Sequence, residues 1–205
     1  MPTAVLPMLA TKVVAPFSRG GWLFEPKWDG YRAICFFRHG QVRFTSRNQR
    51  DLTKRFPELQ SIAKSIKAST AVIDGEIVAL DEEGAQCFDQ LQNNKRDCAI
   101  IYFAFDLMFL DGESLNEVPL LQRKAQLKRI LPKSLAGRIR FTDHVVERGL
   151  DLFAALEAQK LEGMVAKRSD SLYVPGRSRD WLKIKTRAGR EQIENADRDV
   201  GPFVS

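Results

Sequence analysis

The chain has 205 residues, 44% of them hydrophobic, and 32 basic residues against 26 acidic ones give a formal net charge of +6. These figures exclude wholesale disorder and allow one large domain or two small ones. A positive excess suits a polyanionic partner, although many basic proteins have none.

The number of cysteines and the length of the apolar runs indicate the cellular compartment to expect. Three cysteines are too few for a disulfide scaffold, and an odd number leaves one unpaired. They form no CxxC pair that would bind zinc. No apolar run approaches the ~18 residues that span a membrane, and the first residues lack the basic and apolar regions of a signal peptide. We therefore expect a reducing, cytoplasmic setting, with no membrane partner.

The first predicted elements are a hairpin and a helix. Strands are expected over 31–38 and 41–45, joined by a turn at His39-Gly40. A helix is expected to open at Phe56-Pro57-Glu58, because apolar residues then recur at spacings of three and four. Those residues are Leu59, Ile62, Ala63 and Ile66.

Strands then alternate with further helices. The expected strands are 70–80, 100–110, 139–146, 163–167 and 181–185, and the expected helices are 119–131 and 150–160. A loop containing Pro175-Gly176 separates the last two strands. This order is neither strict βαβ alternation nor an all-β array, and it predicts an α+β fold with mainly antiparallel sheets flanked by helices. From Thr186 onward the apolar rhythm fades, so residues 187–205 are expected to form a polar tail.

Lys27 stands between a proline and the turn dipeptide Asp29-Gly30 in the segment EPKWDGYR. The segment is either a charged turn between strands or a holder for a nucleophilic lysine amine.

Asp74-Gly75-Glu76 interrupts an apolar strand pattern. A glycine there indicates the close approach of another backbone or a ligand, and buried carboxylates need partners. A bulge at a strand end is the alternative.

Strict alternation in Trp181–Lys185 puts Lys183 and Lys185 on one face of a strand. Either an anion lies between the two amines, or the strand is a solvated edge strand with protective lysines. Between Leu161 and Arg190 there are eight basic residues against three acidic ones, so the positive charge concentrates in this part of the chain.

Read in order, KWDG, DGE, EGMVAK and LKIK resemble the motifs of the covalent nucleotidyltransferases, which include ATP-dependent DNA ligases, RNA ligases and mRNA capping enzymes. The longer strings EPKWDGYRA, TSRNQRDLT, VIDGEIVALDEEG, FDLMFLDG, LEGMVAKR and WLKIK are similar to bacterial ATP-dependent DNA ligases of the end-joining type. The resemblance implies one adenylation domain over residues 1–186.

That resemblance implies a role for each candidate residue. Lys27 would attack the α-phosphate of ATP to give lysyl-AMP, assisted by Lys183 and Lys185, with Asp29 orienting the lysine loop or the metal shell. Glu162 would help to hold Mg²⁺ or Mn²⁺. The nucleotide or the 5′-phosphate of the nick would be contacted by Arg32 and Arg47, and the nucleotide by Glu25, Glu76, Phe105 and Lys167. Phe105 would stack on adenine, unless it is plain core.

After self-adenylation, AMP would pass to the 5′-phosphate of nicked duplex DNA and the 3′-hydroxyl would then seal the strand. Such ligases normally continue into an OB-fold, and the twenty residues after Lys185 are too few for one. A separate end-joining or clamp factor is the expected compensation. The alternatives are an RNA ligase or capping-type nucleotidyltransferase, and a catalytically incomplete nucleotide- or nick-binding module.

Overall fold

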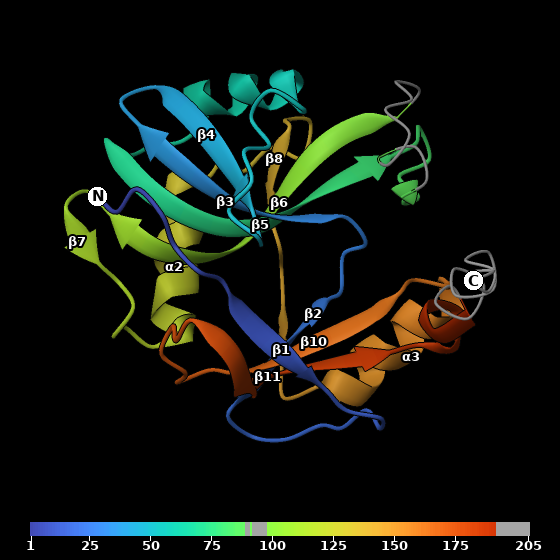
Figure 1. Ribbon diagram of the computed structural model, residues 1–205. Coiled ribbons are helices and arrows are strands. Elements are labelled where there is room, and N and C mark those ends of the chain that lie inside the picture. The colour runs from blue at the N-terminus through green and yellow to red at the C-terminus, as the bar shows by residue number, and fades with distance from the viewer. Residues whose placement is uncertain (89–90, 92–97, 192–205) are drawn as a thin grey trace, which may run out of the picture. The chain divides into compact units, whose positions relative to one another are not determined.

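The computed structural model describes residues 1–88, 91 and 98–191 (Figure 1). The chain forms two compact units. Unit 1 consists of Met1–Leu9, Trp28–Asp143 and Ser169–Ser178, and unit 2 consists of Ala10–Lys27, His144–Arg168 and the chain from Arg179 onward. None of the described helices is long and apolar enough to cross a membrane.

Unit 1 is built on a sheet with the strand order β4-β3-β5-β6-β7. Figure 1 shows β3 to β6 side by side. The neighbouring strands in this order are antiparallel, and β8 adds to β6 in parallel. The strands are β3 (Tyr31–Arg38), β4 (Gln41–Ser46), β5 (Thr70–Leu80), β6 (Ala99–Leu110), β7 (Glu113–Ser114) and β8 (Ile139–Phe141).

The β3–β4 hairpin confirms the predicted turn. His39 and Gly40 both have positive φ, +44° and +79°. Two such residues in succession are typical of the tight turns whose twist matches that of the flanking strands.

The main core of unit 1 lies between one face of this sheet and two helices, the 3₁₀-helix η1 (Pro57–Lys64) and α2 (Leu120–Ile130). The predicted helix at Pro57 therefore exists as a 3₁₀-helix, whose three-residue repeat suits the buried pair Leu59 and Ile62. Ala33, Cys35 and Phe37 supply the inward face of β3, as strand alternation requires.

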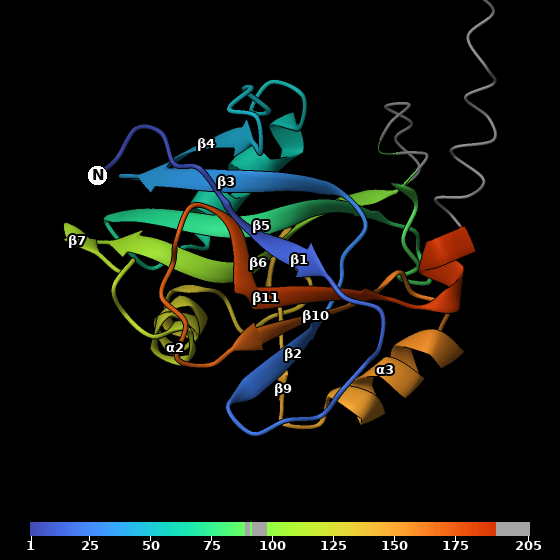
Figure 2. The same cartoon turned by 60° about the horizontal axis from the view of Figure 1, so that its bottom comes forward.

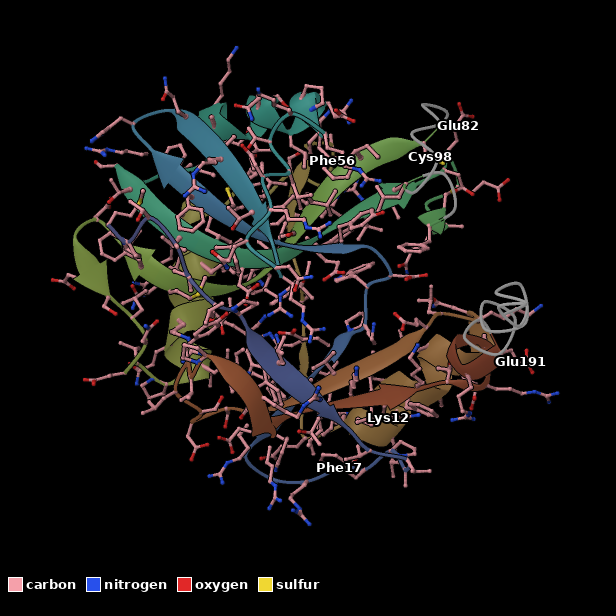
Figure 3. All side chains as sticks on the ribbon, in the orientation of Figure 1. Lys12, Phe17, Phe56, Glu82, Cys98 and Glu191 are labelled. Atoms are coloured by element: carbon pink, nitrogen blue, oxygen red, sulfur yellow. The ribbon has the colours of Figure 1, made fainter. Side chains whose placement is uncertain are left out.

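Unit 2 is built on a sheet with the order β1-β11-β10-β2-β9. Figure 2 shows these strands with α3 (Gly149–Ala158) beside them. The strands are β1 (Met8–Lys12), β2 (Trp22–Pro26), β9 (Val145–Val146), β10 (Gly163–Arg168) and β11 (Gly176–Lys185). One face of the sheet packs against α3 through an apolar cluster of Trp22, Phe24, Met164, Ala166, Ile184 and Leu156. Phe17, labelled in Figure 3, extends this cluster with edge contacts to the rings of Trp22 and Phe24.

The structure differs from the predicted elements in three respects. The single strand expected over 139–146 is wrong, because Tyr102 pairs with Ile139 in unit 1 whereas Phe24 pairs with Val145 in unit 2. The stretch is therefore two short strands in two sheets. Strand β11 begins at Gly176, so the expected loop around Pro175-Gly176 ends earlier than predicted. Strands β1 and β2 were not predicted at all.

The expected polar tail lies mostly outside the described residues. Its first part, 187–191, is helical.

Candidate active site

The face of the unit 2 sheet opposite the apolar cluster carries the charged side chains. Leu182 and Ile184 pack into the apolar cluster, so Lys183 and Lys185 project from the other face, as predicted. In the antiparallel pairing of β11 with β10, Lys185 lies opposite Gly163 and Lys183 lies opposite Val165. Sequence alternation thus places the two lysines on one charged surface.

Glu162 brings two of the predicted site residues together. The amine of Lys27 donates to Oε2 of Glu162 at 2.5 Å, and the amine of Lys185 lies 2.7 Å from Oε1 of the same carboxylate. The side chain of Lys27 is 23% exposed, whereas that of Glu162 is 7% exposed. The side chain of Lys27 is therefore partly exposed, while its carboxylate partner is buried.

Backbone geometry fixes this cluster. The N–H of Lys27 donates to the carbonyl of Gly163 at 2.8 Å, which continues the β2–β10 pairing past Pro26. A Cβ on Gly163 would lie 2.1 Å from the carbonyl oxygen of Ile184. Gly163 therefore lets β10 and β11 approach closely beside Glu162.

A second charged pair on this face is buried. The amine of Lys167 lies 2.6 Å from Oε2 of Glu25, and both side chains are 2% exposed. The same amine sits 4.1 Å from the ring centroid of Trp181, a cation–π distance. Trp181 opens the motif WLKIK, which predicted roles only for its two lysines. The signal that could have identified it is its place two residues before Lys183 on the same strand face.

Unit 1 holds the remaining predicted residues. The carboxylate of Asp74, fully buried, accepts two bonds of 2.6 Å from the guanidinium of Arg32. Burial is the largest single influence and lowers the pKa of Arg32, but the charge and hydrogen bonds of Asp74, with Tyr173 and Glu76, together raise that pKa above its ordinary value. Glu76 lies opposite Arg32 in the β3–β5 register.

Gly75 confirms the predicted close approach. A Cβ there would lie 2.6 Å from the carbonyl oxygen of Phe103 and from the ring of Tyr102. The register also shifts between Asp74 and Gly75, but this irregularity lies in the middle of β5 and not at a strand end, where the alternative expected a bulge.

Phe105 lies in the buried part of β6, 7% exposed, and the guanidinium carbon of Arg32 lies 4.6 Å from its ring centroid. A stacked pair without a predicted role involves Phe103 of the same strand and Trp28, which lies between β2 and β3. The rings of Trp28 and Phe103 stack at 3.7 Å with an interplanar angle of 20°, and Trp28 donates to the hydroxyl of Thr142. Trp28 follows Lys27 directly, which is the signal that could have drawn attention to it.

The last two predicted residues lie in turns. Arg47 is exposed in the turn after β4, which is closed by a bond from the N–H of Ser46 to the carbonyl of Arg50. The N–H of Asp29 donates to Oε1 of Gln86 at 2.7 Å, so the segment after Lys27 is anchored to unit 1.

The described residues contain no group of three or more His, Cys, Asp or Glu side chains that could hold a metal ion. Mg²⁺ is commonly held by one or two carboxylates, with substrate phosphates and water completing its shell. The lone Glu162 fits this mode, with Lys27 and Lys185 as the cations that now occupy its oxygens.

A family model for the ATP dependent DNA ligase domain matches residues 7–185. The chain belongs to this family. The multifunctional non-homologous end joining protein LigD of Mycolicibacterium smegmatis is 39% identical over 188 residues, which are 90% of this chain and 24% of that protein. The SPbeta prophage-derived DNA ligase-like protein LigB of Bacillus subtilis is 30% identical over 185 residues, which are 88% of this chain and 67% of LigB.

A solved structure of a mycobacterial DNA ligase D in complex with ATP and MES is similar to this ligase domain. The TM-score is 0.76 at 36% sequence identity, over 88% of this chain and 60% of that chain. The expected family, the α+β nucleotidyltransferase fold and the ATP-dependent DNA ligase class are therefore confirmed. The chain spans about a quarter of the length of the LigD relatives that it matches.

Proposed function

We propose that this ligase domain forms lysyl-AMP on Lys27 and transfers the AMP to the 5′-phosphate of nicked duplex DNA. The contact between Lys27 and Glu162 carries the proposal. It presents a partly exposed amine at a fixed point, directly bonded to a buried carboxylate and next to a second lysine.

In the first step, Nζ of Lys27 attacks the α-phosphorus of ATP. The N–P bond forms, the bond from that phosphorus to the bridging oxygen breaks, and pyrophosphate leaves with its electron pair. The amine must be neutral to attack. Oε2 of Glu162, 2.5 Å away, is placed to take its proton.

Charge on the phosphates is the main barrier in such a transfer. Lys185, and Lys183 on the same strand face, supply positive charge beside Lys27. Mg²⁺ or Mn²⁺ held at Glu162 would add to this charge compensation.

The unit 1 residues are proposed to bind the nucleotide and the nick. Arg32 and Arg47 offer planar guanidinium groups to phosphate oxygens. Glu76 accepts hydrogen bonds from ribose hydroxyls, and Phe105 offers a ring to adenine. Asp29 orients the segment that follows the nucleophile.

The Glu25–Lys167 pair is also proposed to contact the nucleotide. The two side chains are 2.6 Å apart and each 2% exposed, so the pair is a fixed, buried group on the same sheet face as Lys183 and Lys185.

In the later steps, a 5′-phosphate oxygen of the nick attacks the phosphorus of lysyl-AMP, the P–N bond breaks, and the nitrogen of Lys27 leaves as an amine with the proton returned by Glu162. The 3′-hydroxyl then attacks the activated phosphate and loses its proton to solvent, which forms the phosphodiester bond and expels AMP. Binding of this kind is largely to backbone phosphates, so it is insensitive to sequence and weakens with salt. A separate end-joining or clamp factor, acting at the bacterial nucleoid in the cytoplasm, is the proposed partner for the sealing steps.

Labelling with α-³²P-ATP or α-³²P-GTP and Mg²⁺, followed by a denaturing gel, tests this function. We expect a labelled band with ATP that Lys27→Ala abolishes. Lys12→Ala, which removes an exposed lysine on β1 (Figure 3), should leave the band unchanged.

Preference for GTP would instead support a capping-type nucleotidyltransferase. Folded protein that gives no band with either nucleotide would support a non-catalytic binding module. Sealing of a nicked DNA duplex, compared with a nicked RNA strand, decides between DNA and RNA ligation.

A further inference from the structure

We propose that Tyr173 is a positioning residue for Arg32, acting through the buried carboxylate of Asp74. Tyr173 lies between β10 and β11, outside every motif that carried the family resemblance. The inference rests on the proposed function, in which Arg32 binds a phosphate group of ATP or of the nick.

One buried carboxylate joins the two residues. Asp74 accepts from Nε of Arg32 through Oδ1 and from Nη2 through Oδ2, each at 2.6 Å. The hydroxyl of Tyr173 donates to Oδ2 at 2.6 Å. Short bonds to an ionised acceptor are the strong kind, and two parallel bonds fix the plane of a guanidinium.

The backbone of Met8 completes a closed ring of hydrogen bonds with Arg32, Asp74 and Tyr173, which we call the circuit. Its N–H donates to the hydroxyl oxygen of Tyr173 at 3.0 Å, and its carbonyl accepts from Nη2 of Arg32 at 3.1 Å. Each member therefore restrains its neighbours, and the orientation of Arg32 depends on all three partners.

The side chains of the circuit differ in their exposure to solvent. The Asp74 side chain is fully buried and Tyr173 is 3% exposed, whereas the Arg32 side chain is 20% exposed. Arg32 is thus the member that reaches the surface, and it is held from behind by buried groups. This is the arrangement expected for a cation that must meet an anionic ligand at one angle.

A phenol suits this position because it donates one hydrogen bond and accepts another. Burial, and then the charge of Asp74, raise the pKa of Tyr173 well above its ordinary value, so the hydroxyl keeps its proton. Phenylalanine would leave the N–H of Met8 without this acceptor and Asp74 without this donor.

Tyr173 is itself anchored independently of Arg32. Its N–H donates to the carbonyl of Asn116 at 2.8 Å. Two residues earlier, the carbonyl of Ser171 accepts from the N–H of Leu120 and from Arg123, at the start of α2. The hydroxyl is therefore offered to Asp74 from a fixed part of unit 1.

A double-mutant cycle tests the proposal. Dissociation constants for ATP and for a 5′-phosphorylated nicked duplex are measured on the full chain, for Arg32→Ala, Tyr173→Phe and the double variant. Arg32→Ala should weaken at least one ligand about 10-fold, and Tyr173→Phe should weaken the same ligand about 5-fold. In the Arg32→Ala background, Tyr173→Phe should change the affinity by less than about 1.5-fold.

Tyr31→Phe is the matched control. It removes a phenol hydroxyl that accepts from Arg55, not from the circuit, and it should act equally in both backgrounds. Melting temperatures report any loss of folding separately. If Tyr173→Phe does not fold, Asp74→Asn takes its place in the cycle, with the same expected coupling to Arg32.

Equal effects of Tyr173→Phe in the presence and absence of Arg32 would overturn the proposal. So would an Arg32→Ala variant that binds both ligands as tightly as the unaltered chain. Coupling without any lysyl-AMP formation would overturn the proposed catalysis and leave the positioning role standing.

Discussion

The amine of Lys27 lies 2.5 Å from Oε2 of Glu162, while Oε1 of the same carboxylate is bound by Lys185. A single buried acid thus holds the lysine that follows β2 and the last lysine of β11, the two strands that flank β10 in the unit 2 sheet. The proposed attack on ATP needs a neutral amine, and Glu162 is the acceptor to which the amine of Lys27 is bonded.

Glu162→Gln should lower the rate of lysyl-AMP formation by about 100-fold, since it removes both ion pairs and the proposed proton acceptor. The rate of labelled adduct formation across a range of Mg²⁺ concentrations measures this. Glu191→Gln, which removes one member of an exposed ion pair with Arg187, is the control. Equal rates for the two variants would contradict the role given to Glu162.

Lys167→Met should destabilise the fold by about 3 kcal/mol, because the carboxylate of Glu25 is then buried without its cation. The double variant Glu25→Gln with Lys167→Met should cost less than Lys167→Met alone, since it leaves no uncompensated charge. Urea unfolding of the three proteins gives the comparison. A larger loss of unfolding free energy in the double variant than in Lys167→Met would show that the pair is not held together by charge.

Gly163→Ala should cost more than about 3 kcal/mol of unfolding free energy, because its Cβ would lie 2.1 Å from a backbone oxygen of β11 that cannot move aside. Gly137→Ala is the control, since the nearest atom to its Cβ is 3.9 Å away. Chemical denaturation of both variants should separate them clearly. Similar midpoints would mean that β10 and β11 are not as close as described.

The free energy of unfolding should fall as the pH rises above about 10. The pKa values of Tyr102 and Tyr173 are raised well above their ordinary value, chiefly by burial, so both phenols keep their protons in the folded state. The unfolded chain loses these protons first, and alkaline pH therefore favours unfolding by up to about 1.4 kcal/mol per pH unit for each phenol.

Urea titrations between pH 8 and pH 11 measure this slope, on the order of one proton for each buried tyrosine. Tyr173→Phe should reduce this slope by one phenol's share. Stability that is flat or rises across this range would contradict the burial of these hydroxyls.

Local patterns predicted much of the sheet architecture. Alternation in Trp181–Lys185 placed the lysines on one face, and His39-Gly40 marked the hairpin, because both signals depend on neighbouring residues only. The ordered motifs then predicted the family. The Ile139–Val146 strand could not be divided from sequence, since its two halves pair with distant strands in different units.

The pairing within the candidate site could not be predicted either. Glu25 with Lys167 and Arg32 with Asp74 are contacts between strands far apart in the chain, and each residue type alone has many possible partners. Tyr173 carries no pattern of its own. Its proposed role depends on its hydrogen bond to the carboxylate of Asp74, 99 residues away in sequence.

The most direct measurement is to map the adduct. The protein is incubated with ATP and Mg²⁺, and the modified residue is located by mass spectrometry of its peptides under conditions that preserve the phosphoramidate. A single adenylate on Lys27 is the predicted result. No adenylate on folded protein, or an adenylate on another residue, would contradict the central claim that Lys27 is the nucleophile.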